Sequence, residues 1–370
     1  ALEYEKLLKE KTVEEKQIYK FKDRGGRAVV MRPEKTPSLA RIIASNPNIP
    51  KPLKLYNVGR VWRYDRPQKG RYREFWQVDL DIIGSTNPIS DAEILACTNA
   101  ALKAIGLKKF KFRISSRKLA NQLLEKAGVS KKLISFALRT IDKLDKIGED
   151  GVGAELRKKG VSKESVATLL GFIRTKGSLR QVSKAFLIDD ELMKELQKFE
   201  KNLKNYGIKN YVWDLSLVRG LDYYTGFVFE VDAGKTIGSI AGGGRYDELI
   251  GIYSGKDIPA TGIALGFERI IEILKAKPKK TTAEVFVVPI QTKKQSIKIT
   301  EQLRKAGINT DIDLQERNIS KNLSYASKSG IPYAAIIGKK ELAKKKIRLR
   351  NMKTGKEKLL TIKQAIKKLV

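Results

Sequence analysis

The sequence predicts a multidomain protein of mixed α/β and α+β class, and three observations support this. Short β-rich runs separated by Gly-, Pro- and Lys-rich turns fill residues 19–84. Leu/Lys/Glu-rich segments with helical periodicity occupy residues 116–206, and a β-rich pattern resumes at residue 211. Beyond a charged, Pro-containing stretch at 275–281, strands and helices alternate, which is typical of a compact domain whose sheet includes parallel strands.

The first β-rich stretch contains strands and is followed by a helix. Strands are expected at residues 28–31, 55–56, 60–63 and 75–83. Thr36 is a plausible N-cap, with Pro37 at the first position of a helix that runs to residue 43. Residues 91–105 predict a further helix with one buried face, formed by Ile94, Leu95, Thr98 and Leu102.

The central stretch is predicted to be helical, and the last stretch is predicted to alternate between strands and helices. Helices are expected at 118–127, 131–146, 151–159, 163–175 and 190–205. Strands follow within 211–232 and 238–241, and residues 262–271 continue into a helix that ends near residue 274. The final domain is expected to place strands at 285–290, 310–313 and 333–337, with helices at 293–306 and 319–329.

Composition restricts the chemistry that these 370 residues can perform. The chain has 75 Lys and Arg against 41 Asp and Glu, a formal charge of +34 that favours a polyanionic partner such as a nucleic acid. It contains no histidine, which excludes imidazole bases, Ser-His triads and His-ligated metals within it. Cys97 is its single cysteine, so it forms no internal disulfide and no thiolate zinc site. No apolar run has the length of a membrane span and the first residues do not read as a signal peptide, so we expect a cytoplasmic protein.

An arginine-rich hairpin between residues 63 and 75 is the first candidate site. Its loop carries five basic residues counting Arg63. A strand can aim Arg63 at a phosphate while the other cations close over a polyphosphate, and Phe75 can stack on a base. A solvated surface hairpin is the alternative. Arg269 lies near the start of a predicted helix, where by itself it could form a surface salt bridge.

A second candidate site lies in two segments, 218–226 and 241–247. The first brings Arg219, a carboxylate and the phenols of Tyr223 and Tyr224 into one strand and its turn, groups that suit a zwitterion and a phosphate ester. The second contains three consecutive glycines, whose lack of Cβ atoms would let a ligand lie against backbone. A hairpin turn is the alternative for the glycine run.

These segments resemble class II aminoacyl-tRNA synthetases, and within that class the histidyl-tRNA synthetase family. The hairpin resembles motif 2 and the segment around Arg269 resembles motif 3. The resemblance implies that Arg63, Arg219 and Arg269 are catalytic, with Arg219 taking over work that other class II enzymes give to a metal ion at the α-phosphate. It further implies ATP binding by Arg63, Asp65, Arg71, Phe75 and Arg269.

The same resemblance implies an amino-acid pocket and a tRNA contact. Histidine would be bound by Glu34, Thr36, Gln77, Asp81, Arg219, Tyr223 and Tyr224. Asp79 shares a strand face with Gln77 and Asp81, a form that looks archaeal or eukaryotic. In the motif 2 loop, Gln68 and Arg73 would contact the tRNA acceptor end, where enzymes of the family that the chain resembles read an extra 5′ guanosine.

The resemblance also implies a domain organisation and partners. Residues 1–115 and 207–274 would form the antiparallel-sheet catalytic core, 116–206 a helical insertion, 275–281 a linker and 282–370 an α/β anticodon-binding domain. The N-terminal motif 1 segment is missing, and dimerisation is expected only by analogy. The expected substrates are L-histidine, ATP and tRNA(His), with Mg²⁺ as cofactor and ligands that the sequence does not identify. A non-catalytic histidine-sensing paralogue and a class II synthetase for another amino acid are the alternatives.

Overall fold

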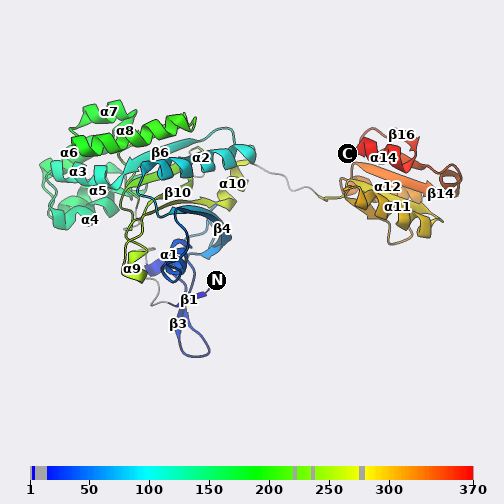
Figure 1. The fold of residues 1–370 in the computed structure, drawn as a ribbon, viewed down its shortest axis with the longest axis horizontal. Coiled ribbons are helices and arrows are strands. Elements are labelled where there is room, and N and C mark those ends of the chain that lie inside the picture. The colour runs from blue at the N-terminus through cyan, green and yellow to red at the C-terminus, as the bar shows by residue number, and fades with distance from the viewer. Residues whose placement is uncertain (1, 5–14, 220–222, 235–237, 275–279, 370) are drawn as a thin grey trace. The chain divides into compact units, whose positions relative to one another are not determined.

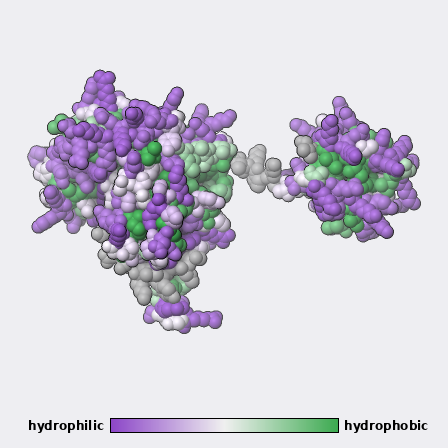
Figure 2. Space-filling view, viewed as in Figure 1, coloured by the Kyte–Doolittle hydropathy of each residue, from purple (hydrophilic) through white to green (hydrophobic). Residues whose placement is uncertain are grey.

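The computed structural model describes residues 2–4, 15–219, 223–234, 238–274 and 280–369. The chain divides into two compact units, Ala1–Lys275 and Ala276–Val370, each with its own apolar cores (Figure 1). Hydrophilic side chains cover most of the visible face of each unit (Figure 2). Residues 275–279 of the expected linker lie outside the described residues. None of the helices in the described ranges combines the length and apolar character needed to cross a bilayer.

The first unit is built on an eight-stranded sheet. Its spatial order is β4 (Leu53–Trp62), β5 (Glu74–Ile83), β11 (Ala260–Gly266), β10 (Ser239–Arg245), β9 (Phe227–Asp232), β6 (Lys111–Ser116), β8 (Tyr211–Asp214) and β7 (Lys176–Gly177). All neighbours pair antiparallel except β6 and β8. The predicted antiparallel-sheet core is therefore confirmed. The separate runs expected at 55–56 and 60–63 belong to one strand, β4, because Asn57, Val58 and Gly59 continue its pairing with β5.

Helices cover one face of this sheet. Helix α2 (Pro88–Ala104) packs against β5 and β11, and α8 (Asp190–Asn205) packs against α2 (Figure 1). The face of α2 predicted to be buried is confirmed, since Leu95, Thr98 and Leu102 are fully buried. Helix α10 (Phe267–Leu274) follows directly from β11. The side chains of β5 alternate between the sheet face that the helices cover and the opposite face. Its polar residues at 77, 79 and 81 therefore share the face that these helices leave uncovered.

A smaller sheet and a short helix precede the large sheet. The strand order of the smaller sheet is β1 (Leu2–Tyr4), β3 (Ala28–Met31) and β2 (Lys20–Lys22), and a 3₁₀ turn lies at Glu15–Gln17. Helix α1 (Thr36–Ala44) begins one residue earlier than expected, and its N-cap is Lys35 rather than Thr36. The prediction of a Thr36 cap was wrong because Thr36 already has helical backbone, which puts Pro37 at the second position.

Helices α3–α7 are inserted between the adjacent parallel strands β6 and β8. They are α3 (Arg117–Lys126), α4 (Ile134–Ile141), α5 (Leu144–Lys158), α6 (Lys163–Ile173) and α7 (Leu179–Ala185), with a 3₁₀ turn at Lys131–Leu133. The single helix expected over 131–146 is wrong, since the chain changes direction at residues 142–143. Gly148, at φ 67°, interrupts the regular backbone of α5, because this left-handed conformation is not helical.

The second unit is a five-stranded sheet with helices. Its order is β13 (Thr310–Ile312), β12 (Val285–Ile290), β14 (Tyr333–Gly338), β15 (Ile347–Asn351) and β16 (Glu357–Leu360). Its helices are α11 (Lys293–Lys305), α12 (Ile319–Lys328), α13 (Lys339–Ala343) and α14 (Ile362–Leu369). Strand β12 runs parallel to β13 and β14, which confirms the predicted α/β pattern with parallel strands.

Candidate active site

A cavity of about 1960 Å³ opens on the sheet face opposite α2 and is lined by strands β5, β10 and β11 and the loop between β4 and β5. Thirteen predicted site residues line it: Glu34, Thr36, Arg63, Asp65, Gln68, Arg71, Phe75, Gln77, Asp81, Arg219, Tyr223, Tyr224 and Arg269. Arg73 lies outside this lining, with its guanidinium carbon 4.4 Å from the centre of the Tyr64 ring. Residues that are distant in sequence therefore meet in one hollow.

The β4–β5 hairpin holds its arginines by backbone and carboxylate contacts. The Arg63 Nε donates to the Pro33 carbonyl at 2.8 Å, and its guanidinium carbon lies 5.4 Å from the centre of the Phe75 ring. Asp65 accepts from the Arg71 Nη2 at 2.7 Å and from the Gln17 Nε2 at 3.0 Å. Phe75 and Arg63 thus form a cationic and aromatic wall that suits a nucleotide.

Arg269 completes a group of three cations at this end of the cavity. It lies in the first turn of α10 and donates to the carbonyls of Ser239 and Gly70, the latter at 3.3 Å. Burial lowers the pKa of Arg269, and the like charges of Arg71 and Arg63 lower it further. A bound polyanion would relieve this repulsion, because opposite charges at short range favour the charged forms.

Arg219 enters from the other side of the cavity in a left-handed conformation, at φ 54°. Its Nη1 donates to the Glu230 Oε1 at 2.7 Å, and Glu230 also accepts from the Arg113 Nη1 at 3.2 Å. Burial opposes its charge, but Tyr224 and Glu230 raise the pKa of Arg219 above that of a free arginine, so the side chain is a fixed cation. Its buried Nε has no hydrogen-bond partner within the described ranges. Residues 220–222 of the same motif lie outside those ranges.

The glycine run serves the protein's own packing. A Cβ on Gly242 would lie 2.2 Å from the Arg219 Nη1, and one on Gly243 would lie 2.0 Å from the Gly262 carbonyl oxygen. A Cβ on Gly244 would meet the Tyr224 ring at 2.7 Å. The glycines lie inside strand β10 rather than in a turn, and Arg219, β11 and Tyr224 lie close to them, while Gly242 and Gly243 also line the cavity.

The opposite end of the cavity carries carboxylates and phenols. The Tyr223 hydroxyl donates to the Glu34 Oε2 at 3.2 Å, and the ring centres of Tyr223 and Tyr224 lie 4.8 Å apart. The Tyr246 hydroxyl donates to the Asp81 Oδ1 at 2.5 Å. Burial raises the pKa of all three tyrosines, which keeps their hydroxyls protonated as donors.

Two neighbouring carboxyls in this end titrate near neutrality. Burial raises the pKa of Asp79 to about 6, against the opposing charges of Lys35 and Arg63. Burial and the charge of Asp79 raise the pKa of Asp81 to about 7. In a chain without histidine, these carboxyls give the site its response to pH near 7.

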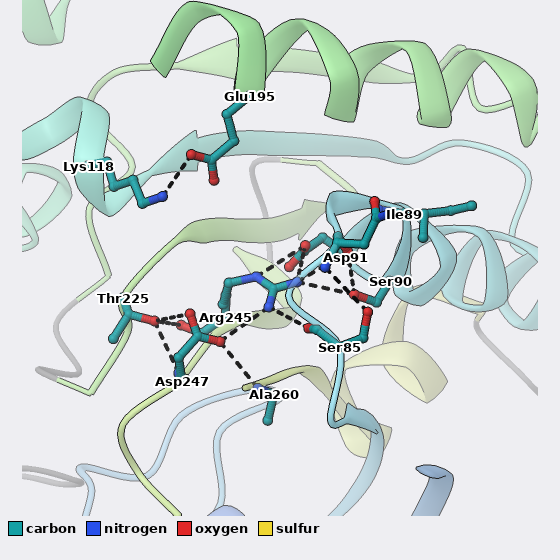
Figure 3. A network of polar contacts seen from close by, with 11 residues as sticks. Ser85, Ile89, Ser90, Asp91, Lys118, Glu195, Thr225, Arg245, Asp247 and Ala260 are labelled. Carbon is teal, nitrogen blue, oxygen red and sulfur yellow. Dashed lines mark hydrogen bonds and ion pairs between the residues drawn. The ribbon is translucent and has the colours of Figure 1, made fainter. Parts of the chain in front are cut away.

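Arg245, in the same motif as the glycines, is absent from the cavity lining and forms a buried network of polar contacts (Figure 3). It is buried and donates to the Asp91 Oδ2 at 2.5 Å, to the Ser85 carbonyl at 2.8 Å and to the Asp247 Oδ1 at 3.2 Å. These contacts join β10 to the start of α2 and fix the position of β10, the strand that contains the three glycines.

Sequence reasoning missed three polar residues of the site: Lys35, Glu230 and Tyr246. Glu230 could have been found as the single carboxylate between the apolar residues of β9, since such a residue faces either solvent or a partner. Tyr246 belongs to the candidate segment 241–247, whose role was argued from its glycines alone. No sequence signal separates Lys35 from surface lysines. Within the described residues, no group of three or more His, Cys, Asp or Glu side chains is arranged to hold a metal ion.

Two family models divide the chain between them. A model described as histidyl-tRNA synthetase matches residues 1–270, and one described as anticodon binding domain matches residues 284–370. A synthetase core joined to an anticodon-binding unit defines an aminoacyl-tRNA ligase.

Individual relatives show to which family of aminoacyl-tRNA ligases the chain belongs. A histidine–tRNA ligase of Thermococcus kodakarensis is 39% identical over 390 residues, covering 100% of this chain and 89% of the relative. One of Clostridium tetani is 36% identical, covering 95% and 84%. A crystal structure of histidyl-tRNA synthetase from a Nostoc species has a TM-score of 0.87 at 28% identity, covering 100% of this chain and 89% of that one. The chain therefore belongs to the histidyl-tRNA synthetase family, which confirms the predicted family and its likeness to archaeal members.

A further solved structure shares the fold alone. It comes from Bacillus halodurans and is described as an ATP phosphoribosyltransferase regulatory subunit/histidyl-tRNA synthetase. Its TM-score is 0.74 at 24% identity, covering 88% of this chain and 85% of that one. Fold likeness at this level does not separate an enzyme from a regulatory paralogue.

Proposed function

We propose that this chain activates L-histidine with ATP and transfers the histidyl group to tRNA(His). The observation that carries the proposal is the composition of the cavity, whose lining includes Arg63, Arg71 and Arg269 together with Glu34 and Tyr223. Three cations suit a triphosphate, and an acceptor carboxylate beside phenol hydroxyls suits an amino acid.

Activation needs no nucleophile from the protein. A histidine carboxylate oxygen attacks the α-phosphorus, forming the mixed anhydride, while the α–β phosphoanhydride bond breaks and its electron pair leaves with pyrophosphate. Arg63 and Arg219 would stabilise the charge that grows on the α-phosphate, and Arg269 would hold the leaving phosphates. In the second step a terminal ribose hydroxyl of tRNA attacks the anhydride carbonyl and AMP leaves.

Magnesium is assigned to the nucleotide rather than to the protein. Mg²⁺ is commonly held by substrate phosphates, waters and one or two carboxylates. The carboxylates nearest the phosphate end already accept from the protein, Asp65 from Arg71 and Glu230 from Arg219. We therefore propose that Mg²⁺ would enter bound to ATP.

ATP–pyrophosphate exchange with each of the twenty amino acids tests the activation step. Exchange that depends on histidine alone is expected. Exchange with another amino acid would indicate a different synthetase, and a complete lack of exchange by folded protein would favour a non-catalytic histidine-sensing paralogue.

The acceptor end and the anticodon of tRNA(His) would bind at different places. Gln68 lies in the β4–β5 loop at the cavity, and Arg73 closes that loop beside Tyr64. We propose that these two residues contact the acceptor end, and that the unit that includes β12–β16 binds the anticodon. Removal of residues 282–370 should spare exchange with histidine and reduce tRNA charging by orders of magnitude. Charging at the intact rate would contradict the assignment.

We also propose a homodimer that works in the cytoplasm, where translation supplies its tRNA. Exposed apolar side chains gather at the sheet edge formed by β4 and β5 and on the adjoining α10: Tyr56, Val58, Trp76, Phe267 and Ile271. A second copy of the chain would cover them. Light scattering on a size-exclusion column should give the mass of two chains, and Val58→Asp should shift it towards one. A monomeric wild-type protein would contradict this proposal.

A further inference from the structure

Lys35 is a fully buried lysine behind the amino-acid end of the cavity. Only 1% of its surface is exposed, and its aliphatic stem passes over Gly59, where a Cβ would lie 3.8 Å from the Lys35 Cδ. Its Nζ donates to the Asn57 carbonyl at 2.5 Å and to the Gln77 carbonyl at 2.8 Å, and lies 3.7 Å from the Asp79 Oδ2. A buried ammonium persists only with such partners, because its desolvation is costly.

Asp79 connects this ammonium to the cavity. It is 4% exposed and lines the cavity between Gln77 and Asp81 on the same face of β5. Its Oδ1 has no hydrogen-bond partner among the residues described, while its Oδ2 is the oxygen near Lys35. One carboxylate oxygen thus forms an ion pair with Lys35, and the other is a buried acceptor whose missing hydrogen bond a ligand donor could supply.

The charges around the pair require a cation at this place. Asp79 and Asp81 are two buried carboxyls that repel each other when both are ionised. The other groups that act on Asp79 are Arg63 and Arg32, but the Arg63 Nε is bonded to the Pro33 carbonyl and the Arg32 Nη2 to the Arg60 carbonyl. Lys35 is the cation paired with Asp79 directly.

We propose that Lys35 is a positioning residue of the amino-acid pocket, which holds Asp79 ionised so that its Oδ1 accepts a hydrogen bond from the side-chain N–H of the imidazole substrate. Lys35 itself does not line the cavity, although its neighbours Glu34 and Thr36 do. It therefore acts through Asp79. The inference rests on the proposed function, since it requires histidine at this end.

The substitution Lys35→Met removes the charge and keeps the length of the stem. The KM for histidine in ATP–pyrophosphate exchange near pH 7 should rise by about 10- to 100-fold, the equivalent of a hydrogen bond to a charged group. The KM for ATP should stay unchanged. Loss of the ammonium raises the pKa of Asp79 above about 6, so the defect should shrink as the pH rises and Asp79 ionises again. A purely structural role would give a defect that does not change with pH.

A double-mutant cycle separates the outcomes. Asp79→Asn alone and Lys35→Met/Asp79→Asn should have the same KM for histidine, because Lys35 acts through the Asp79 charge. The double variant also leaves no unpaired buried carboxylate that could prevent folding. Asp81→Asn as a background removes the neighbouring carboxyl, whose pKa of about 7 lies in the same pH range. Unchanged KM in Lys35→Met, or a defect that adds to that of Asp79→Asn, would overturn the inference. Exchange by the wild type with histidine tests the proposed function separately.

Discussion

Gly242 provides a sensitive test of Arg219, because the two occupy adjacent space. A Cβ on Gly242 would lie 2.2 Å from the Arg219 Nη1 and 2.7 Å from its Cζ, closer than the 3.0 Å below which real Cβ contacts essentially do not occur. Gly242→Ala therefore forces the guanidinium to retreat by about 1 Å, and a displacement of this size at a reacting centre costs about 100-fold in rate. Gly242 lies in strand β10, where an alanine backbone is unstrained, so the fold should persist.

The assay is histidine-dependent ATP–pyrophosphate exchange, with the melting temperature as a control for folding. Arg219→Ala should lose about 3 kcal/mol or more of transition-state stabilisation, the loss expected for one preorganised charge-stabilising donor. Gly242→Ala made in the Arg219→Ala background should have no further effect, since the clash partner is gone. An exchange rate within tenfold of wild type in well-folded Gly242→Ala, or an additive loss in the double variant, would refute the assigned role of Arg219.

Three further predictions follow from the pocket. Tyr224→Phe and Gln77→Ala should each weaken histidine binding, because a buried polar pocket that loses a partner discriminates less well; unchanged affinity by calorimetry would remove them from the pocket. Burial raises the pKa of Asp81 from 3.8 to about 7, so the folded chain keeps a proton that the unfolded chain has lost, and stability should fall as the pH rises from about 4 to about 7. Asp81→Asn should flatten this fall in urea unfolding of the free protein, and an identical slope would contradict the raised pKa. Gln68→Ala should reduce charging of tRNA that has an extra 5′ guanosine more than charging of tRNA without it; equal losses would argue against base readout.

Local patterns predicted most of the elements. Helix α8 and strand β12 have the predicted ends, because the amphipathic period of the first and the apolar run of the second are uninterrupted. The prediction failed where tertiary contacts decide the boundary. Residues 131–146 have helical composition, but a turn at residues 142–143 separates α4 from α5, and a non-helical backbone at Gly148 interrupts α5 before Val152 and Leu156 join the core that α4 also enters.

The candidate site was predictable in its cations and less so in its buried polar contacts. Arg63, Arg219 and Arg269 belong to sequence segments that resemble synthetase motifs, and all three line the cavity. The partners of these residues come from elsewhere in the chain: Glu230 from β9 for Arg219, and Lys35 from the start of α1 for Asp79. Such pairs depend on strand register, which a single sequence does not specify.

The lack of histidine in the 370 residues has a physical consequence for the proposed reaction. Adenylate formation requires charge stabilisation and no proton transfer by the protein, and arginines supply charge without titrating near neutrality. Burial lowers the pKa of Arg269 only from the range of a strong base. Asp79 and Asp81, whose pKa values are raised by burial to about 6 and about 7, lie with Gln77 on one face of β5, in the proposed amino-acid pocket. A change of pH should therefore act first on the KM for histidine and only later on the KM for ATP, an order that an imidazole base at the reacting phosphate would not give.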